Sequence, residues 1–100
     1  MGQASEVAML AKWFEMLAID EYRVTYGLKC VTQAMSEGAV ETLFISDKLF
    51  RSKNIDQRKT YVRMHDMGLK DGLKVVVFSA QSPSGDRLNG MTGVAAILRY

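Results

Sequence analysis

A length of 100 residues predicts a single domain, large enough to bury a hydrophobic core. Hydrophobic residues form 48% of the chain and charged residues 24%, a balance that excludes an intrinsically disordered protein. The net charge of +2 is compatible with an RNA-rich partner, but domains that bind nucleic acid through phosphates alone usually carry a denser basic face. The single cysteine, Cys30, excludes an internal disulfide bond and fits a reducing compartment.

The longest apolar segment, near the N-terminus, is too short to span a membrane because Lys12 and Glu15 interrupt it. It also lacks the layout of a signal peptide. The chain begins with Met-Gly and stops at Tyr100 inside an apparent strand. We therefore expect residues 1–100 to be one domain excised from a longer multidomain protein.

Apolar spacing predicts a first helix over residues 5–18. One apolar stripe repeats at intervals of three and four residues: Val7, Leu10, Phe14 and Leu17. A second apolar set lies about 100° further round the same helix: Met9, Trp13 and Met16. Two interpretations of this second set stay open. It is covered by a neighbouring segment, or it forms a partner-binding face anchored by Trp13, since aromatic and methionine side chains are enriched in interface cores.

The next elements follow closely along the chain. Residues 19–23 indicate a link or a short helical turn, and a second helix is predicted over residues 26–37 with Gly38 as its C-terminal stop. Residues 40–45 are apolar at consecutive positions, which is typical of a central strand covered on both faces. Ser46 and Asp47 then offer oxygen caps for a short helical turn that ends near Arg51.

The C-terminal half alternates helix and strand in the same way. Asp56 is the predicted N-cap of a helix that reaches about Gly68, and the strand Lys74–Phe78 follows. Ser84 is the predicted cap of a helix that ends near Gly93, before the last strand, Val94–Leu98. Strands separated by helical segments predict an α/β fold in which helices sandwich a sheet.

The residue types that carry catalysis are sparse and scattered. His65 is the only histidine and shares a helix side with Tyr61 and Val62, so a packed or half-exposed imidazole is expected. Cys30 adjoins the inward-facing Val31, which indicates a semi-buried thiol. The segment from Gly85 to Thr92 superficially matches a phosphate-binding loop but lacks its lysine. We therefore predict no metal, no cofactor and no active site.

A string of basic residues runs through the middle of the sequence: Lys48, Arg51, Lys53, Arg58, Lys59 and Arg63. One interpretation is a solvated rim, in which exposed charges alternate with other residues. The other is contact with ribosomal RNA or with an acidic protein surface, for which the candidate residues are Lys48, Arg51, Arg58 and Lys59. Both interpretations stay open at this point.

Three stretches of sequence are distinctive: YGLKCVTQAMSEGAVETLFISDKLFR, RKTYVRMHD and VFSAQSPSGDRLNGMTGVAAILRY. Together they resemble the C-terminal, third domain of the Pelota family, the ribosome-rescue paralogues of the eukaryotic class-1 peptide release factor. The resemblance extends from about Val7 to the end of the chain. It implies a three-layer α/β/α sandwich around a small mixed sheet, similar to the kink-turn RNA-binding ribosomal proteins.

The resemblance also implies a function. The parent protein would act in the cytoplasm, entering stalled ribosomes with a translational GTPase of the elongation-factor type. It would then promote subunit dissociation with the recycling ATP-binding-cassette ATPase, in no-go and non-stop mRNA surveillance. This domain would dock those partners without being an enzyme, since the GGQ triplet of release factors is absent.

In the release factor, the helix corresponding to residues 5–18 contributes to the GTPase-binding surface. The resemblance therefore implies three partner-binding residues: Met9, Trp13 and Met16. An autonomous RNA-binding module of the kink-turn-binding fold is the alternative. Residues 27–31 lack the asparagine and glutamate that start the corresponding helix of kink-turn binders.

Overall fold

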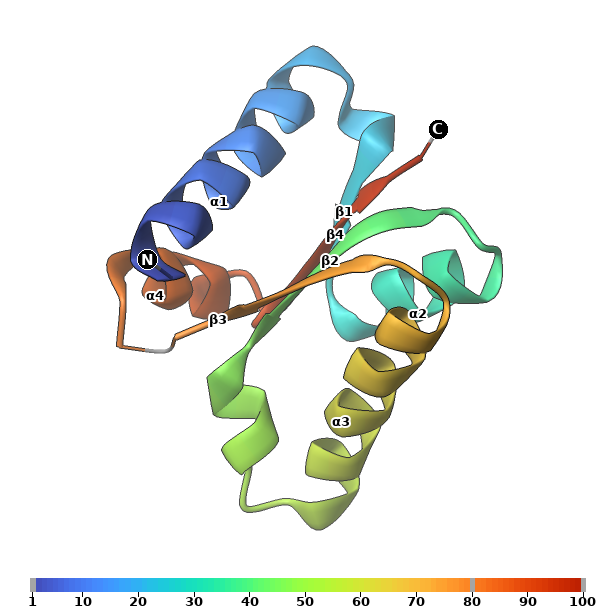
Figure 1. Cartoon of the computed structure of the whole chain (residues 1–100), viewed down its shortest axis with the longest axis vertical. Coiled ribbons are helices and arrows are strands. Elements are labelled where there is room, and N and C mark those ends of the chain that lie inside the picture. Colours follow the sequence, from blue (N-terminus) through green and yellow to red (C-terminus); the bar gives the residue numbers. More distant parts are fainter. Residues whose placement is uncertain (1, 80, 100) are drawn as a thin grey trace.

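The computed structural model describes residues 2–79 and 81–99 and shows four α-helices and one four-stranded sheet there (Figure 1). The helices are α1 (Gly2–Ile19), α2 (Leu28–Ser36), α3 (Ile55–Lys70) and α4 (Pro83–Gly90). The strands are β1 (Val24–Tyr26), β2 (Val40–Ser46), β3 (Lys74–Phe78) and β4 (Val94–Leu98). Two 3-10 helices, η1 (Glu21–Arg23) and η2 (Asp47–Arg51), precede β1 and follow β2. The predicted α/β fold is confirmed.

The sheet is mixed and has the strand order β1-β4-β2-β3. β4 is antiparallel to both of its neighbours, β1 and β2, whereas β2 and β3 are parallel. β1, β2 and β3 therefore run in one direction, and their C-terminal ends lie at the same end of the sheet as the start of β4. The prediction that residues 40–45 form a central strand is confirmed, because β2 has a partner on each side.

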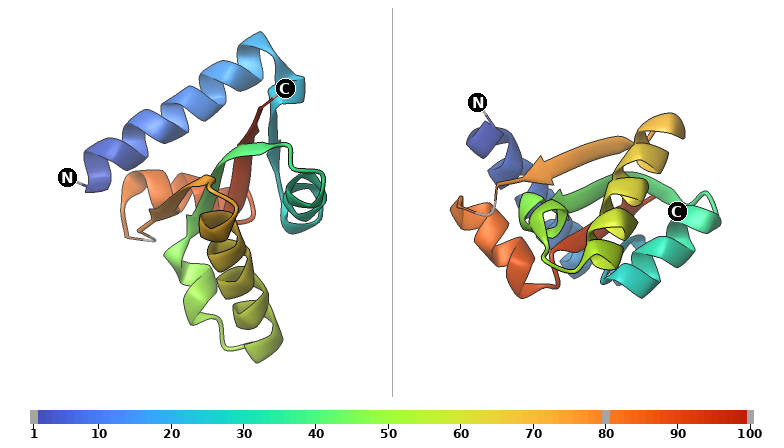
Figure 2. Two further views of the ribbon diagram at one scale, coloured as in Figure 1. Left: turned by 45° about the vertical axis from the view of Figure 1, so that its right-hand side comes forward. Right: turned by 90° about the horizontal axis from the view of Figure 1, so that it is seen from below.

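Helices cover both faces of the sheet, with α1 and α4 on one face and α2 and α3 on the other (Figures 1 and 2). The α1/α4 side packs around one set of buried residues: Leu10, Trp13, Val24, Phe44, Phe78, Leu88, Ala95 and Ile97. The α2/α3 side packs around another: Val31, Ala34, Val40, Leu43, Ile45, Tyr61, Met64, Val94 and Ala96. Successive residues of β4 thus alternate between the two cores, as the pleat of a strand requires.

One irregularity in β2 adjusts this alternation. Val40 pairs with Leu98 and Thr42 pairs with Ile97, so Glu41 is an extra residue, a β-bulge. The bulge shifts the phase of the strand, and as a result Val40 lies in the same core as Leu43. The exposed Glu41 carboxylate lies 3.9 Å from the Arg23 guanidinium, which also donates to the carbonyl of Leu98.

The structure differs from the predictions at several boundaries. Residues 24–26 form β1, where no strand was predicted, because pairing with β4 decides the state of a segment too short to show its own periodicity. The N-cap of α3 is Asn54 rather than Asp56, and the N-cap of α4 is Ser82 rather than Ser84. In α4 the cap is followed by Pro83 at the first helical position, where a missing N–H costs nothing.

Gly85 is required by a close approach between α4 and the end of β3. A Cβ atom at this position would lie 1.7 Å from the carbonyl oxygen of Ser79. The amide of Gly85 donates to the hydroxyl of Ser82, whose own proton goes to the same Ser79 carbonyl. The glycine at position 85 therefore reflects a steric requirement of this turn.

We predict that Gly85→Ala lowers the free energy of unfolding by roughly 3 kcal/mol or more, since a methyl group cannot be fitted beside backbone atoms without moving the loop. Gly90→Ala is the matched control, because no atom lies within 4 Å of a Cβ there. Alanine is the better helix former by up to about 1 kcal/mol, so the control should be neutral or stabilising. Urea denaturation of both variants checks this, and equal stability of the two would contradict it.

Candidate interaction surfaces

Trp13 lies in the protein core rather than on the surface. Its side chain is 1% exposed, and its indole Nε1 donates to the carbonyl oxygen of Ala96 in β4 at 3.1 Å. Edge-to-face contacts with Phe14 and Tyr26 complete its surroundings. The prediction that Trp13 anchors an exposed partner-binding face is therefore wrong, because the sheet covers this ring.

The rest of α1 is arranged around Trp13. Leu10 is buried with it, whereas Val7 and Leu17 of the first predicted apolar stripe are exposed. The core-facing side of the helix is therefore centred between the two predicted apolar sets. Met9 and Met16 are partly buried at the margin of this core. Their contact with a partner stays a prediction.

Apolar side chains gather on the surface where α1 ends and β1 begins. Four of them form what we call the tyrosine patch: Leu17, Ile19, Tyr22 and Tyr26. Tyr22 is 81% exposed, Ile19 74% and Tyr26 53%. A hollow of about 500 Å³ beside α1 is lined by Leu17, Tyr22 and Tyr26. The neighbouring side chains of Asp20 and Glu21 give this patch an acidic border.

The basic string is divided between two places in the structure. Lys48, Arg51 and Lys53 line a hollow of about 420 Å³ beside η2, which we call the basic hollow. The other described residues of its lining are neutral: Leu49, Ser52, Gln57, Asn89 and Thr92. Arg58, Lys59 and Arg63 lie instead along α3, where they border a separate hollow with Val62, Asp66 and Met67. The structure thus brings together only part of the predicted set.

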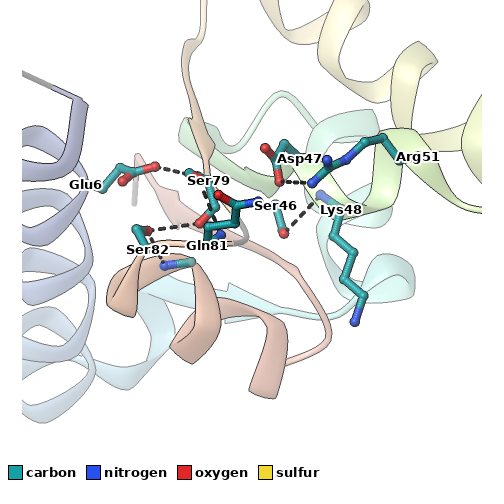
Figure 3. A network of polar contacts seen from close by, with 9 residues as sticks. Glu6, Ser46, Asp47, Lys48, Arg51, Ser79, Gln81 and Ser82 are labelled. Atoms are coloured by element: carbon teal, nitrogen blue, oxygen red, sulfur yellow. Dashed lines mark hydrogen bonds and ion pairs between the residues drawn. The ribbon is translucent and has the colours of Figure 1, made fainter.

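A network of polar contacts joins the ends of β2 and β3 to the neighbouring elements (Figure 3). The amide of Ser79 donates to the Glu6 carboxylate at 2.5 Å, which ties α1 to the loop before α4. The hydroxyl of Ser46 accepts from the amide of Lys48, and Arg51 forms an ion pair with Asp47 at 3.3 Å. These contacts fix the start of η2 and so the position of the basic hollow.

The nucleophilic and titratable candidates do not share a site. The exposed Cys30 thiol borders the tyrosine patch, so the prediction that it is semi-buried is wrong. His65 is partly buried against Phe50, as predicted, and pairs with Asp66 at 3.2 Å. Burial raises the pKa of the Tyr61 phenol, and a hydrogen bond with the Gln57 side chain opposes this, so the phenol stays protonated near neutral pH.

Two further findings concern the residues described, 2–79 and 81–99. His, Cys, Asp and Glu side chains nowhere form a group of three that could hold a metal ion. None of the helices in this part of the chain has the length and apolar character needed to cross a membrane.

The sequence reasoning missed Gln57, Asn89 and Thr92 in the basic hollow and both tyrosines of the tyrosine patch. For Tyr22 and Tyr26 a signal was present, since one large aromatic residue lies within the expected link and the other at the start of the helix predicted after it. Asn89 and Thr92 carry no such signal, because only the fold brings the end of α4 beside η2.

Comparison with known proteins shows the family. Residues 3–100 match the family described as eRF1 domain 3. The chain belongs to this family. The chain is 41% identical over 97 residues to the pelota homolog of Xenopus laevis and 42% identical over the same length to that of Homo sapiens. Each alignment covers 97% of the chain and 25% of the relative, so the chain spans about a quarter of the length of these proteins.

Solved structures of Pelota-family proteins support the same family assignment. The structure of this chain superposes on Saccharomyces cerevisiae Dom34 with a TM-score of 0.91 at 33% identity, covering 97% of this chain and 27% of that one. Dom34 is described as a translation termination-like factor involved in RNA quality control pathways and interacting with Hbs1. A ribosome-bound archaeal Pelota with ABCE1 gives a TM-score of 0.82 at 35% identity, covering 98% of this chain and 27% of that one. The resemblance to the third domain of Pelota is confirmed.

We predict that Trp13→Ala lowers the free energy of unfolding by about 3–5 kcal/mol, because it removes a large ring from the core. Trp13→Phe should cost less, since it keeps most of the apolar contact and loses the hydrogen bond to Ala96. Val7→Ala, on the exposed side of the same helix, should change stability by no more than about 0.5 kcal/mol. Chemical denaturation checks the series, and a mild effect of Trp13→Ala would contradict the burial of this ring.

Proposed function

We propose that this chain is a non-catalytic docking domain of a Pelota-type translation surveillance factor. In this role it binds a translational GTPase of the Hbs1 type and the recycling ATPase ABCE1 on stalled cytoplasmic ribosomes, in no-go and non-stop mRNA decay. The observation that carries the proposal is the family match over residues 3–100, joined to relatives described as interacting with Hbs1 and as ribosome-bound with ABCE1.

The positions of the reactive and of the exposed apolar side chains support a docking role. Cys30 and His65 border different parts of the surface, on α2 and α3, so a nucleophile and a base are not brought together there. Several large apolar side chains that are exposed next to one another, as in the tyrosine patch, are typical of a surface that a partner covers.

We place the GTPase-docking surface at the tyrosine patch and the adjoining margin of α1, where Met16 is partly exposed. Tyrosine is among the residues that most often dominate interface energetics, because it offers a large apolar ring and a hydrogen-bonding hydroxyl. The acidic border formed by Asp20 and Glu21 favours a partner with basic residues around its contact surface.

The architecture also fits the three-layer sandwich of kink-turn RNA-binding ribosomal proteins, since helix pairs cover both faces of a small mixed sheet. Those proteins read RNA with polar residues at the start of the helix that corresponds to α2. Here that helix begins after Gly27 without a side-chain cap, and its first residues are Leu28, Lys29 and Cys30. We therefore favour partner docking over autonomous recognition of kink-turns.

Calorimetric titration of this chain with the Hbs1-type GTPase of the same organism tests the proposal. Wild type should bind with a stoichiometry near one to one. Tyr22→Ala should weaken the affinity about tenfold or more, if this ring supplies at least about 1.4 kcal/mol of the binding free energy. Because Tyr22 is almost fully solvated, the same variant should fold normally.

Val62→Ala, at an exposed apolar position on α3, is the matched control and should bind as wild type does. Undetectable binding of the wild-type chain would contradict a docking role for this domain. Unchanged affinity of Tyr22→Ala would remove the tyrosine patch from the interface.

A further inference from the structure

The basic hollow lies at the end of the sheet where β2 stops and β4 starts. Its walls come from η2, from the η2–α3 loop that holds Ser52 and Lys53, from the first turn of α3, and from the segment that runs from the end of α4 to Thr92. The turn before β4 packs tightly on η2, since a Cβ at Gly93 would lie 3.1 Å from Leu49. This contact positions the turn that holds Thr92 against the element that holds Lys48 and Arg51.

Three of the eight described lining residues of this hollow are lysine or arginine and none is acidic, and most of the lining belongs to the more basic part of the chain. Residues 47–71 contain seven lysines and arginines against four aspartates, whereas residues 1–46 contain three basic residues against six acidic ones. Within the described part of the chain, neither Lys48 nor Lys53 takes part in an ion pair. Figure 3 shows the Lys48 side chain extending away from the Asp47–Arg51 pair. Two ammonium groups are thus available to an anionic ligand.

Thr92, on the wall of the hollow, has a backbone conformation that threonine rarely adopts. α2 and α3 end in turns whose left-handed residues are Gly38, with φ 68°, and Gly72, with φ 78°. α4 ends in the same turn, in which the amide of Gly93 donates to the carbonyl of Leu88, but the left-handed residue is Thr92, with φ 85°. A β-branched residue is strained there and glycine is not.

Strain of this kind persists where the surrounding structure enforces it, and it is concentrated at binding and switch sites. The strained position is the helix end that borders the basic hollow, and the threonine supplies a side chain to its lining where glycine would supply none. Threonine and asparagine side chains are also hydrogen-bond donors for phosphate oxygens. A hydroxyl at position 92 that binds a ligand would explain why threonine stands where glycine would be unstrained.

We propose that the basic hollow binds phosphate groups of a structured RNA backbone. It brings together lysine and arginine charges with the neutral donors Asn89 and Thr92, the combination that contacts phosphates without reading sequence. An acidic protein surface would need apolar contact area as well, and among the described lining residues Leu49 alone is apolar. The proposal rests on the proposed function at the ribosome and adds an RNA contact to it.

Fluorescence anisotropy of a labelled, mixed-sequence RNA hairpin, titrated at several KCl concentrations, tests this site. The wild-type chain should bind at low salt, with an affinity that falls steeply as salt rises. The double variant Lys48→Ala/Lys53→Ala should bind about tenfold more weakly or worse. Its salt slope should be smaller by about 2, because each phosphate contact contributes about 1 to the slope. Lys12→Ala/Lys29→Ala removes the same charge from exposed positions on α1 and α2 and should change neither quantity.

A third variant distinguishes the effect of Thr92 on stability from its effect on RNA binding. Thr92→Gly should raise the urea midpoint of unfolding, because glycine is relaxed at this position, and should weaken RNA binding, because the hydroxyl is lost. The proposal is overturned if the wild type does not bind RNA at low salt, or if the two double variants lose affinity equally. It is also overturned if polyglutamate displaces the RNA as well as an equal charge of polyphosphate does, which would indicate an acidic protein ligand.

The two proposals fail separately. Tyr22→Ala should bind the RNA hairpin as wild type does, and Lys48→Ala/Lys53→Ala should bind the GTPase as wild type does. Loss of the GTPase interaction alone would contradict the docking role and leave the phosphate site standing. Loss of the RNA interaction alone would remove the phosphate site and leave the docking role intact.

Discussion

Burial of β2 and β4 on both faces is the constraint on which the rest of this structure depends. Residues that point to either face of these two adjacent strands are fully buried, so the pair needs apolar cover from two sides. Helices supply this cover on both faces. The bulge at Glu41 serves this requirement, because it allows β2 to fill one core with Val40 while Thr42 and Phe44 face the other. The short edge strand β1 and the helix ends are then positioned by what the central pair requires.

The contacts that fix α1 on the sheet also determine which of its side chains are exposed to partners. Trp13 fixes the middle of the helix over β4, Glu6 fixes its start to the β3–α4 loop, and the Arg87 guanidinium stacks 4.4 Å from the Phe14 ring centroid. With these side chains facing inward, the apolar residues near the end of the helix face solvent. Core packing and exposed binding surface are thus determined together, and the same helix serves both.

Much of the fold could be predicted from the sequence, because long apolar runs and caps are local signals. Residues 40–45, the strand Lys74–Phe78 and the last strand were recognisable in this way. β1 was not, since three residues are too few to show the alternation of apolar and polar positions that marks a strand. They are extended because they pair with β4. The role of Trp13 was also out of reach: a wide apolar arc indicates that much of a helix is covered, but only the packed structure shows whether the sheet or a partner covers it. The basic string was visible as a string, yet residues adjacent in sequence lie on η2 and α3 and face different hollows.

Because Trp13 is buried, its fluorescence emission reports whether α1 is packed on the sheet. The chain contains one tryptophan, so its emission reports a single location, the contact between α1 and β4. An indole in an apolar core emits at shorter wavelength than one in water, and separation of α1 from the sheet would therefore appear as a red shift without any attached dye. Since α1 leads directly into the tyrosine patch, the spectrum distinguishes a partner that binds the folded helix from one that pulls it away from the sheet.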